Sequence, residues 1–425
     1  MPLALAGLTK LPTNDSMVSM RMRYLAKAIP ELCFAWRKMA FVSGPRQCGK
    51  TTLARMLLKQ RKSGAYTNWD EPAFRRAWGR DPRSVLPKPK GKDVPLLVLD
   101  EIHKHTRWKR HLKGVYDTLE SPCDILVTGS ARLNVYRRHS DSLVGRHFNL
   151  RLHPFSLREM ERPDSLSPDK LIDALFSRAF RRRRSAQDRL DALMRFGPFP
   201  EPLFGGNDNM TRRWRRSREQ LVIREDLRDI SKLPELDRLE IMTSLLPERI
   251  GSLFSVAAMR EDLECGFHTV KRWMKYLNEL YYLFEVKPYT KRIPRSLRRE
   301  GKVYLWDFGA VPNRAARFEN LVACHLLKAC HFWTDQGLGQ FDLFYLRNKE
   351  KQEIDFLIVR DGSPWLPVEV KLSEDEPSQS WRKFAPLLPC KHGLQLVYQP
   401  KWKICNFGES MVLVAGAAEA LDYFA

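Results

Sequence analysis

Apolar and polar positions along the first 130 residues predict helices that alternate with short buried strands. From Met22 to Leu32 the apolar side chains recur every three or four positions, which predicts a helix over residues 21–37. Three continuous apolar runs predict strands buried on both faces, as in a parallel sheet. They cover residues 39–43, 96–99 and 125–128. Four prolines between the first two runs make residues 81–95 a predicted loop.

The pattern changes along the rest of the chain. Residues 165–250 are arginine-rich and follow a helical pattern, interrupted by the segment GPFP at 197–200. Residues 252–310 predict a compact helical unit followed by short strands, and residues 315–329 predict a helix that precedes a strand-rich tail. This organisation predicts four domains, at residues 1–160, 161–250, 251–310 and 311–425.

Composition narrows the class of protein. A chain of 425 residues with 43% hydrophobic content can form several packed cores, which excludes a wholly disordered protein. No stretch approaches the roughly 18 uncharged apolar residues of a membrane span, so we expect no membrane partner. Eight cysteines include no C-x-x-C pair and no Cys/His cluster at zinc spacing. This favours reduced thiols and a cytoplasmic location.

The net charge of +23 is unevenly distributed. Residues 1–160 carry 30 basic and 13 acidic side chains, and residues 161–310 carry 30 and 23. Residues 311–425 carry 13 and 14. A basic field of this kind attracts polyanions such as nucleic acid or an acidic membrane surface. The alternative is a solvated basic surface that keeps the protein soluble.

The clearest motif lies at residues 44–51, which read GPRQCGKT and match G-x-x-x-x-G-K-[ST]. It follows an apolar strand and opens a helix, so its backbone N–H groups are expected to surround a phosphate at the helix N-terminus. Lys50 would then reach the β- and γ-phosphates of ATP, and the Thr51 hydroxyl would coordinate Mg²⁺. The predicted nucleotide-binding residues are Gly44, Pro45, Arg46, Gln47, Cys48, Gly49, Lys50, Thr51 and Thr52. The Cys48 thiol either makes binding sensitive to oxidation or is a passive spacer.

Two further strands end in polar residues. The run LLVLDE at 96–101 is an apolar strand that ends in two carboxylates. We expect Asp100 to hold Mg²⁺ and Glu101 to polarise the attacking water, so that the site hydrolyses ATP. The third strand ends in Thr128, Gly129 and Ser130, and Ser130 is a candidate for contact with the γ-phosphate or the water.

These motifs resemble the prokaryotic AAA-superfamily ATPases, in particular a group whose C-terminal half is a domain without an assigned function. The runs that carry the resemblance are GPRQCGKTTL, LLVLDEIHKHTRWKRHLKGVYD, ILVTGSARL, SLVGRHFNLRLHPFSLREM, GPFPEP and IREDLRDI. The resemblance implies an α/β fold with a P-loop parallel-sheet ATPase domain, a helical lid, a winged helix and a C-terminal α/β domain. It also makes Arg146 a candidate nucleotide contact, in its own chain or in a neighbouring subunit. The alternative is a surface arginine.

Residues 255–284 predict two helices around a short turn, followed by aromatic-rich strands. Helical spacing directs Val270, Trp273, Met274 and Leu277 inward. This layout is typical of a helix-turn-helix with a wing, and the resemblance also implies a winged helix. The predicted contacts with double-stranded DNA are His268, Lys271, Arg272 and Lys275, with a basic wing at Lys287, Lys291, Arg292, Arg295, Arg298 and Arg299. The alternative is a packing or protein-docking module.

The tail at 344–372 predicts three strands joined by tight turns. Alternation puts Glu369 and Lys371 on one face of a strand, and Asp355 on the neighbouring strand is within reach. This D…E-x-K pattern resembles the PD-(D/E)XK (restriction-endonuclease-like) nuclease fold. The resemblance implies that Asp355 and Glu369 bind a metal ion, that Lys371 orients water, and that Glu319 is an outer ligand. An ion pair of Lys371 with Asp355 or Glu369 is a sufficient non-catalytic explanation.

Three functions therefore stay open. The first is an ATP-binding, Mg²⁺-dependent ATPase associated with DNA. The second is an ATP-gated, metal-dependent DNA nuclease. The third is a nucleotide-dependent switch that docks to a protein partner. A homo-oligomer is a separate partner expectation that also stays open.

Overall fold

The structure is a computed structural model of the chain. It describes residues 21–129, 143–161, 166–177, 184–226, 236–290, 300–373 and 376–424. Ser130 and the basic residues at 291–299 lie outside these segments.

Five parallel strands form the first sheet, in the order β2-β3-β4-β1-β5. The strands are β1 (Met39–Ser43), β2 (Gly64–Asn68), β3 (Leu96–Asp100), β4 (Asp124–Gly129) and β5 (His147–Arg151). The three strands expected from the apolar runs are confirmed as β1, β3 and β4.

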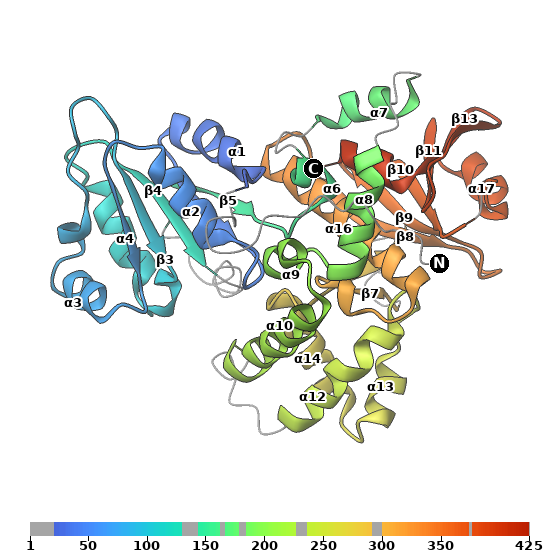
Figure 1. Cartoon of the computed structure of the whole chain (residues 1–425), viewed down its shortest axis with the longest axis horizontal. Coiled ribbons are helices and arrows are strands. Elements are labelled where there is room, and N and C mark those ends of the chain that lie inside the picture. Colours follow the sequence, from blue (N-terminus) through green and yellow to red (C-terminus); the bar gives the residue numbers. More distant parts are fainter. Residues whose placement is uncertain are drawn as a thin grey trace, which may run out of the picture.

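Helices cover both faces of this sheet, which explains why its strands are apolar at successive positions (Figure 1). On one face, Ala40 and Val42 pack with α1 (Leu25–Leu32) and α2 (Lys50–Lys59). On the other, Met39 and Phe41 pack with α3 (Pro72–Arg80) and α4 (Trp108–Asp117).

The helix expected over residues 21–37 is shorter in the structure. Helix α1 ends at Leu32, and a separate turn of 3₁₀-helix follows before the left-handed Arg37 (φ 53°). Pro30 lies inside α1, and proline disfavours a long helix because it lacks an N–H and its ring crowds the preceding turn.

The middle of the chain is helical over its described residues, as the sequence predicts. Helices α10, α12, α13 and α14 gather on one side of the molecule, at the bottom of the view in Figure 1. The helices are α6 (Leu157–Glu161), α7 (Pro168–Phe176), α8 (Arg184–Phe196), α9 (Pro200–Gly205), α10 (Asp208–Gln220), α12 (Leu236–Leu245), α13 (Val256–Asp262) and α14 (Phe267–Glu279). A π-helical turn covers Leu221–Asp226.

The second sheet has eight strands in the order β12-β13-β11-β10-β9-β8-β6-β7. They are β6 (Leu283–Pro288), β7 (Lys302–Leu305), β8 (Phe341–Arg347), β9 (Glu353–Arg360), β10 (Ser363–Lys371), β11 (His392–Val397), β12 (Trp402–Phe407) and β13 (Ser410–Gly416). Lys287 of β6 pairs with Phe344 of β8 in parallel. The two strands that follow α14 therefore continue the sheet of the tail.

Helix α16 (Arg314–Asp335) joins the two sheets. It extends six residues beyond the expected end at 329 and contacts β8, β9 and β10 as well as β5 of the first sheet. Two short helices complete the tail, α17 (Gln379–Phe384) and α18 (Ala417–Ala420). Short 3₁₀ turns cover Phe34–Trp36, Pro82–Val85, Ile102–Lys104, Leu246–Arg249, Phe308–Ala310, Ala385–Leu387 and Leu421–Tyr423. None of the helices in the described segments is long and apolar enough to cross a membrane.

Candidate functional site

The glycine-rich loop between β1 and α2 curls tightly before the helix begins. Gln47 (φ 61°) and Gly49 (φ 99°) both adopt left-handed backbone conformations. The buried Lys50 opens α2, and its Nζ donates to the carbonyl oxygens of Gly44 (2.9 Å) and Pro45 (2.7 Å). The loop and the N-terminus of α2 thus form the concave, positively polarised backbone that suits a phosphate group.

The remaining residues of the loop differ in exposure. Arg46 and Thr52 are half-buried, whereas Gln47 is exposed. Cys48 is fully buried, and its Sγ lies 3.6 Å from the carbonyl oxygen of Leu152. This position beneath the loop fits the passive spacer better than an oxidation-sensitive thiol, because a buried thiol is shielded from solvent.

Asp100 is the centre of the polar network at the end of β3, and it is 2% exposed. Its Oδ2 accepts hydrogen bonds from the hydroxyls of Thr51 (2.9 Å) and Tyr66 (2.6 Å). Its Oδ1 accepts one from Thr128 (2.6 Å). The strand order causes this meeting, because β4 lies between β1 and β3 and pairs with both. A hydroxyl and a carboxylate side by side fit the oxygen ligands that Mg²⁺ prefers.

Glu101 follows directly in a left-handed conformation (φ 56°), and its N–H donates to the carbonyl of Thr128 (2.9 Å). Burial raises the pKa of the Glu101 carboxyl, and Lys50 opposes that effect. The Nε2 of buried His103 lies 3.3 Å from its Oε2. Glu101 is therefore near Lys50, as expected, and has a histidine neighbour that the sequence analysis did not identify.

Arg146 does not lie near the loop. It precedes β5 at the amino end of the strands, where its carbonyl accepts from the N–H of Met39 (2.9 Å). Its guanidinium pairs with Asp117, with Nε 2.5 Å from Oδ1. The glycine-rich loop follows the carboxyl end of β1, and β1 is parallel to β5. The loop and Arg146 therefore lie at opposite ends of these strands. The structure therefore does not bring Arg146 to the loop of its own chain, and its contact with a nucleotide, in this chain or in a neighbouring subunit, stays a prediction.

A buried arginine that the sequence analysis did not identify donates a hydrogen bond to the glycine-rich loop. Arg23 donates to the carbonyl oxygens of Cys48 (2.5 Å) and His153 (2.5 Å), and its Nε lies 2.9 Å from Glu159. Burial opposes the charge on Arg23, but Glu159 outweighs it and the pKa of the guanidinium is raised. No local pattern could have revealed this contact, because Arg23 and Glu159 are 136 positions apart.

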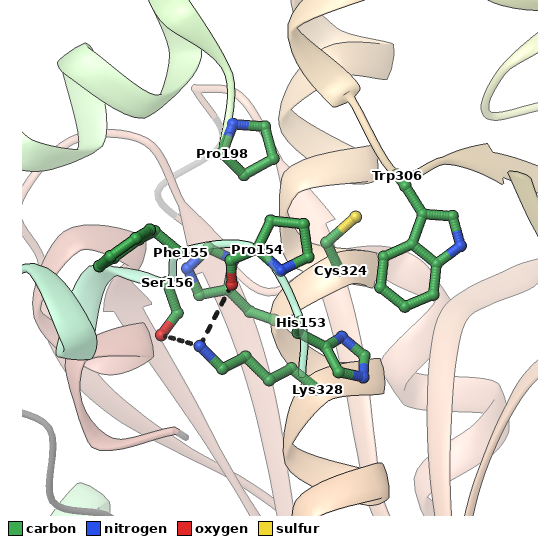
Figure 2. Close-up of a pocket in the computed structure, with 9 residues that line it drawn as sticks. His153, Pro154, Phe155, Ser156, Pro198, Trp306, Cys324 and Lys328 are labelled. Atoms are coloured by element: carbon green, nitrogen blue, oxygen red, sulfur yellow. Dashed lines mark hydrogen bonds between the residues drawn. The ribbon is translucent and has the colours of Figure 1, made fainter. Parts of the chain in front are cut away.

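Glu159 also binds a lysine of the tail. Figure 2 shows Lys328 of α16 directed toward Ser156 and the Pro154 carbonyl, which accept from its Nζ at 2.9 and 3.4 Å. The same ammonium pairs with Glu159. Burial lowers the pKa of Lys328 to about 8, although Glu159 opposes that effect. Lys328, Ser156 and Pro154 line a small cavity between the segment after β5 and α16.

Helix α14 has one buried and one basic face. Val270, Trp273 and Leu277 are buried, and Met274 is half-buried against the core. The four candidate DNA contacts, His268, Lys271, Arg272 and Lys275, are all exposed. The proposed wing begins at half-buried Lys287, and its remaining residues lie outside the described segments.

The structure brings the acidic residues of the tail together, but not around a metal position. Lys371 Nζ lies 3.1 Å from Glu369 Oε1, which is the ion pair offered as a non-catalytic explanation. Glu319 and Asp355 both contact Lys302, a residue that the sequence analysis missed. Among the described residues, no group of three or more His, Cys, Asp or Glu is placed to hold a metal ion. The local signal for Lys302 was a charged residue directly before the apolar run VYLW at residues 303–306.

Comparison with family models gives a match for the segment that contains the first sheet. Residues 36–161 match an AAA domain. This segment contains the glycine-rich loop, Asp100 and Glu101, so the match supports a nucleotide-binding P-loop ATPase domain of the AAA type. Residues 187–322 match a domain of unknown function, DUF8612, and residues 314–416 match another, DUF4143.

The chain is also similar to bacterial proteins of unassigned function. It is 23% identical over 336 residues to an uncharacterized protein of Mycobacterium tuberculosis, which covers 77% of this chain and 69% of that protein. It is 21% identical to an uncharacterized protein of Haemophilus influenzae, with coverage of 77% and 81%.

Two solved structures are distantly similar. One is the Aeropyrum pernix ORC1 protein in complex with DNA, with a TM-score of 0.32, 14% identity and coverage of 74% of this chain and 94% of that one. The other is AMPPCP-bound DnaA from Aquifex aeolicus, with a TM-score of 0.28, 16% identity and coverage of 60% and 86%. TM-scores this low support no argument about fold or function.

Proposed function

We propose that this protein is a Mg²⁺-dependent ATPase that contacts double-stranded DNA through helix α14. The observation that carries the proposal is the meeting of four side chains at one edge of the first sheet. Lys50 and Thr51 open α2, Asp100 ends β3, and Glu101 follows that strand directly. Lys50 would bind the β- and γ-phosphates, and Thr51 and Asp100 would hold Mg²⁺.

Glu101 is the proposed group that polarises water for attack on the γ-phosphate. Its elevated pKa, caused by burial, makes the carboxylate a stronger base than an exposed glutamate. The left-handed backbone at Glu101 turns the chain away from the strand immediately after Asp100. Two adjacent carboxylates can therefore serve different roles, one on the metal and one on the water.

ATP binding and turnover by purified variants test the ATPase. Lys50→Ala should lose nucleotide affinity, because the ammonium is removed from the phosphate site. Glu101→Gln should bind ATP normally and turn it over at least about a hundredfold more slowly. Lys59→Ala, an exposed change at the other end of α2, is the matched control and should behave as wild type. Unchanged turnover in Glu101→Gln would remove Glu101 from the proposed role.

The DNA contact is supported by the charge on α14 and by the positive charge of the first 310 residues. Lys271 lies over the exposed ring of Phe267, with Nζ 4.6 Å from the centroid. Next to it, Arg272 is exposed and available for a phosphate contact. Three exposed cations on one helix, Lys271, Arg272 and Lys275, can neutralise several phosphates, which predicts affinity that falls steeply with salt.

Fluorescence anisotropy with a labelled duplex between 50 and 200 mM salt tests this contact. The double variant Lys271→Glu/Arg272→Glu should weaken binding and reduce the salt slope by about two. Arg382→Glu/Lys383→Glu makes the same charge change on the exposed surface of α17 and should have little effect. Equal weakening by both variants would assign the binding to net charge alone. An absence of duplex binding at about 100 mM salt would favour protein docking instead.

A further inference from the structure

Lys302 places a buried ammonium group inside the acidic cluster of the tail. It is the first residue of β7, and its side chain is 3% exposed. Its Nζ lies 3.1 Å from Oε1 of Glu319 and 3.3 Å from Oδ1 of Asp355, and it also pairs with Glu353. One ammonium group thus binds carboxylates from α16 and β9 and uses all three of its donors.

Further hydrogen bonds within the chain hold the cluster. Oδ2 of Asp355 accepts from the N–H of Val370 (2.9 Å), and Tyr304 donates to Oε1 of Glu319 (2.7 Å), the oxygen that also binds Lys302. Arg347 pairs with Glu353 at 3.1 Å. Lys371 pairs with Glu369 (3.1 Å). Four carboxylates therefore face three cations, which leaves little uncompensated negative charge to attract a divalent ion.

We propose that Lys302 is the permanent cation of this cluster and takes the place where the D…E-x-K pattern predicts a divalent metal. Mg²⁺ requires oxygen ligands at roughly 2.0–2.1 Å. Of the carboxylates that would supply them, Asp355 and Glu319 each give one oxygen to the Lys302 ammonium, and Glu369 pairs with Lys371. A divalent ion beside Lys302 would also meet a like charge with little water to screen it. The cluster then ties β7, α16, β9 and β10 together, and it is not a metal-dependent hydrolytic centre.

Lys302 stays charged in this environment. Burial by itself disfavours the ammonium form, but Glu319, Asp355 and Glu353 outweigh burial, and the pKa of Lys302 is raised. The lysine therefore neutralises the cluster throughout the physiological pH range. Removal of its charge would leave the carboxylates to repel one another, unless another cation takes its place.

Solvent reaches the rim of the cluster at Glu319 and Lys371, although Lys302 itself is buried, so poor access does not explain the lack of a metal position. An open groove lies against it, lined by Pro247, Gly251, Glu319 and Lys371, among other residues. Gly251 (φ 82°) approaches Glu319 so closely that an added Cβ would lie 3.2 Å from its Oε2. An ion added to the solution could enter along this groove, which makes a binding experiment informative.

Mn²⁺ titration of the nucleotide-free full chain, followed by the electron paramagnetic resonance signal of free Mn²⁺, tests the proposal. Wild type and Asp355→Asn should bind the same amount of Mn²⁺, because the cluster holds none. Lys302→Met should gain one site and melt at a lower temperature, and Mn²⁺ should restore its melting temperature. Lys371→Met is the matched control: it removes a cation from the same cluster, retains Lys302 and should gain no site.

Two results would overturn the proposal. One is a wild-type Mn²⁺ site that Asp355→Asn abolishes, because the metal would then displace Lys302. The other is a folded Lys302→Met that gains no site, or gains no more than Lys371→Met. If Lys302→Met folds only with Mn²⁺, that result supports the proposal. If it does not fold at all, the comparison of wild type with Asp355→Asn decides.

Discussion

At the scale of single residues, Asp100 shows how neighbours orient one carboxylate. Three hydroxyls donate to it, from α2, β2 and β4, so both of its oxygens are fixed before any ligand arrives. A carboxylate held in one orientation can bind a cation without first losing conformational freedom. The three donors should therefore affect how tightly the site holds Mg²⁺.

Thr128→Val tests this effect, because it removes one donor with little change in shape. We expect ATP turnover to fall about tenfold and the Mg²⁺ concentration for half-maximal activity to rise, as a hydrogen bond to a charged group contributes roughly 1.5–3 kcal/mol. Steady-state ATPase assays over a range of Mg²⁺ concentrations measure both. The control is Thr67→Val, because the Thr67 hydroxyl donates to the Val98 carbonyl (2.8 Å) and not to Asp100. An unchanged Mg²⁺ dependence would contradict the assigned role of Thr128.

His325 provides a pH-dependent contribution to stability. Its Nδ1 lies 2.8 Å from the carbonyl oxygen of Leu321, and its Nε2 accepts from the N–H of Leu157 (3.1 Å). Both bonds are consistent with a neutral ring, because an imidazolium has no acceptor. Burial lowers the pKa of His325 to about 4, and nearby Lys328 adds to this effect, while Glu159 opposes it.

The folded state therefore binds this proton less readily than the unfolded state does. Stability from His325 should be present above pH 6.5 and be lost as the pH falls toward 4, by roughly 3 kcal/mol at most. Denaturant unfolding of wild type and His325→Gln at several pH values measures it. The stability difference between the two should shrink or reverse at acidic pH. A difference that is constant between pH 7 and 4 would refute the prediction.

At the scale of elements, the glycine-rich loop is packed against the segment that follows β5. A Cβ added at Gly44 would lie 2.2 Å from the carbonyl oxygen of Leu152, which is backbone and cannot rotate away. The N–H of Leu152 in turn donates to the Ser43 carbonyl (2.8 Å). Glycine is therefore required at position 44 for space.

Gly44→Ala should displace the loop and lower ATP affinity at least about tenfold, because the phosphate-binding N–H groups would move with it. Gly79→Ala is the matched control. Gly79 lies in α3 with nothing within 4 Å of an added Cβ, so alanine should be neutral or stabilise the helix by about 0.5–1 kcal/mol. Equilibrium nucleotide binding and thermal melting distinguish the two variants. Normal ATP affinity in Gly44→Ala would be incompatible with this packing.

At the scale of the whole molecule, buried polar contacts connect the glycine-rich loop to the rest of the chain. Arg23 links the loop to Glu159, and Glu159 binds Lys328 of α16. From the helical side, the Tyr281 hydroxyl donates to Ser43 at the end of β1 (3.1 Å). A displacement of the loop would therefore disturb contacts with α16 and with the segment after α14.

A double-mutant cycle with Lys328→Met and Glu159→Gln measures the strength of this connection. We expect a coupling energy above about 1 kcal/mol, because removal of one partner leaves a buried charge with fewer contacts. The control cycle uses Arg195 and Asp208, an exposed pair that should couple more weakly because solvent screens it. Free energies of unfolding give both values. Equal coupling in the two cycles would show that the buried connection is no stronger than a surface pair.

The sequence by itself determined the parts of the protein that depend on local order. The run GPRQCGKT after an apolar strand was sufficient to locate the phosphate loop, and the carboxylates after the run LLVL located Asp100 and Glu101. The two faces of α14 also followed from helical spacing. In each case the residues that decide the structure are close in sequence, so a short window contains the necessary information.

Only the tertiary structure decided which distant charges meet. It placed Arg146 at the amino end of β5, whereas the loop lies at the carboxyl ends of the strands. It brought Arg23 to Glu159 and joined β6 to the sheet of the tail. It also placed Lys302 among carboxylates from two other elements. The D…E-x-K pattern describes spacing along strands, but the cation that balances those carboxylates depends on which chain segment the fold packs beside them.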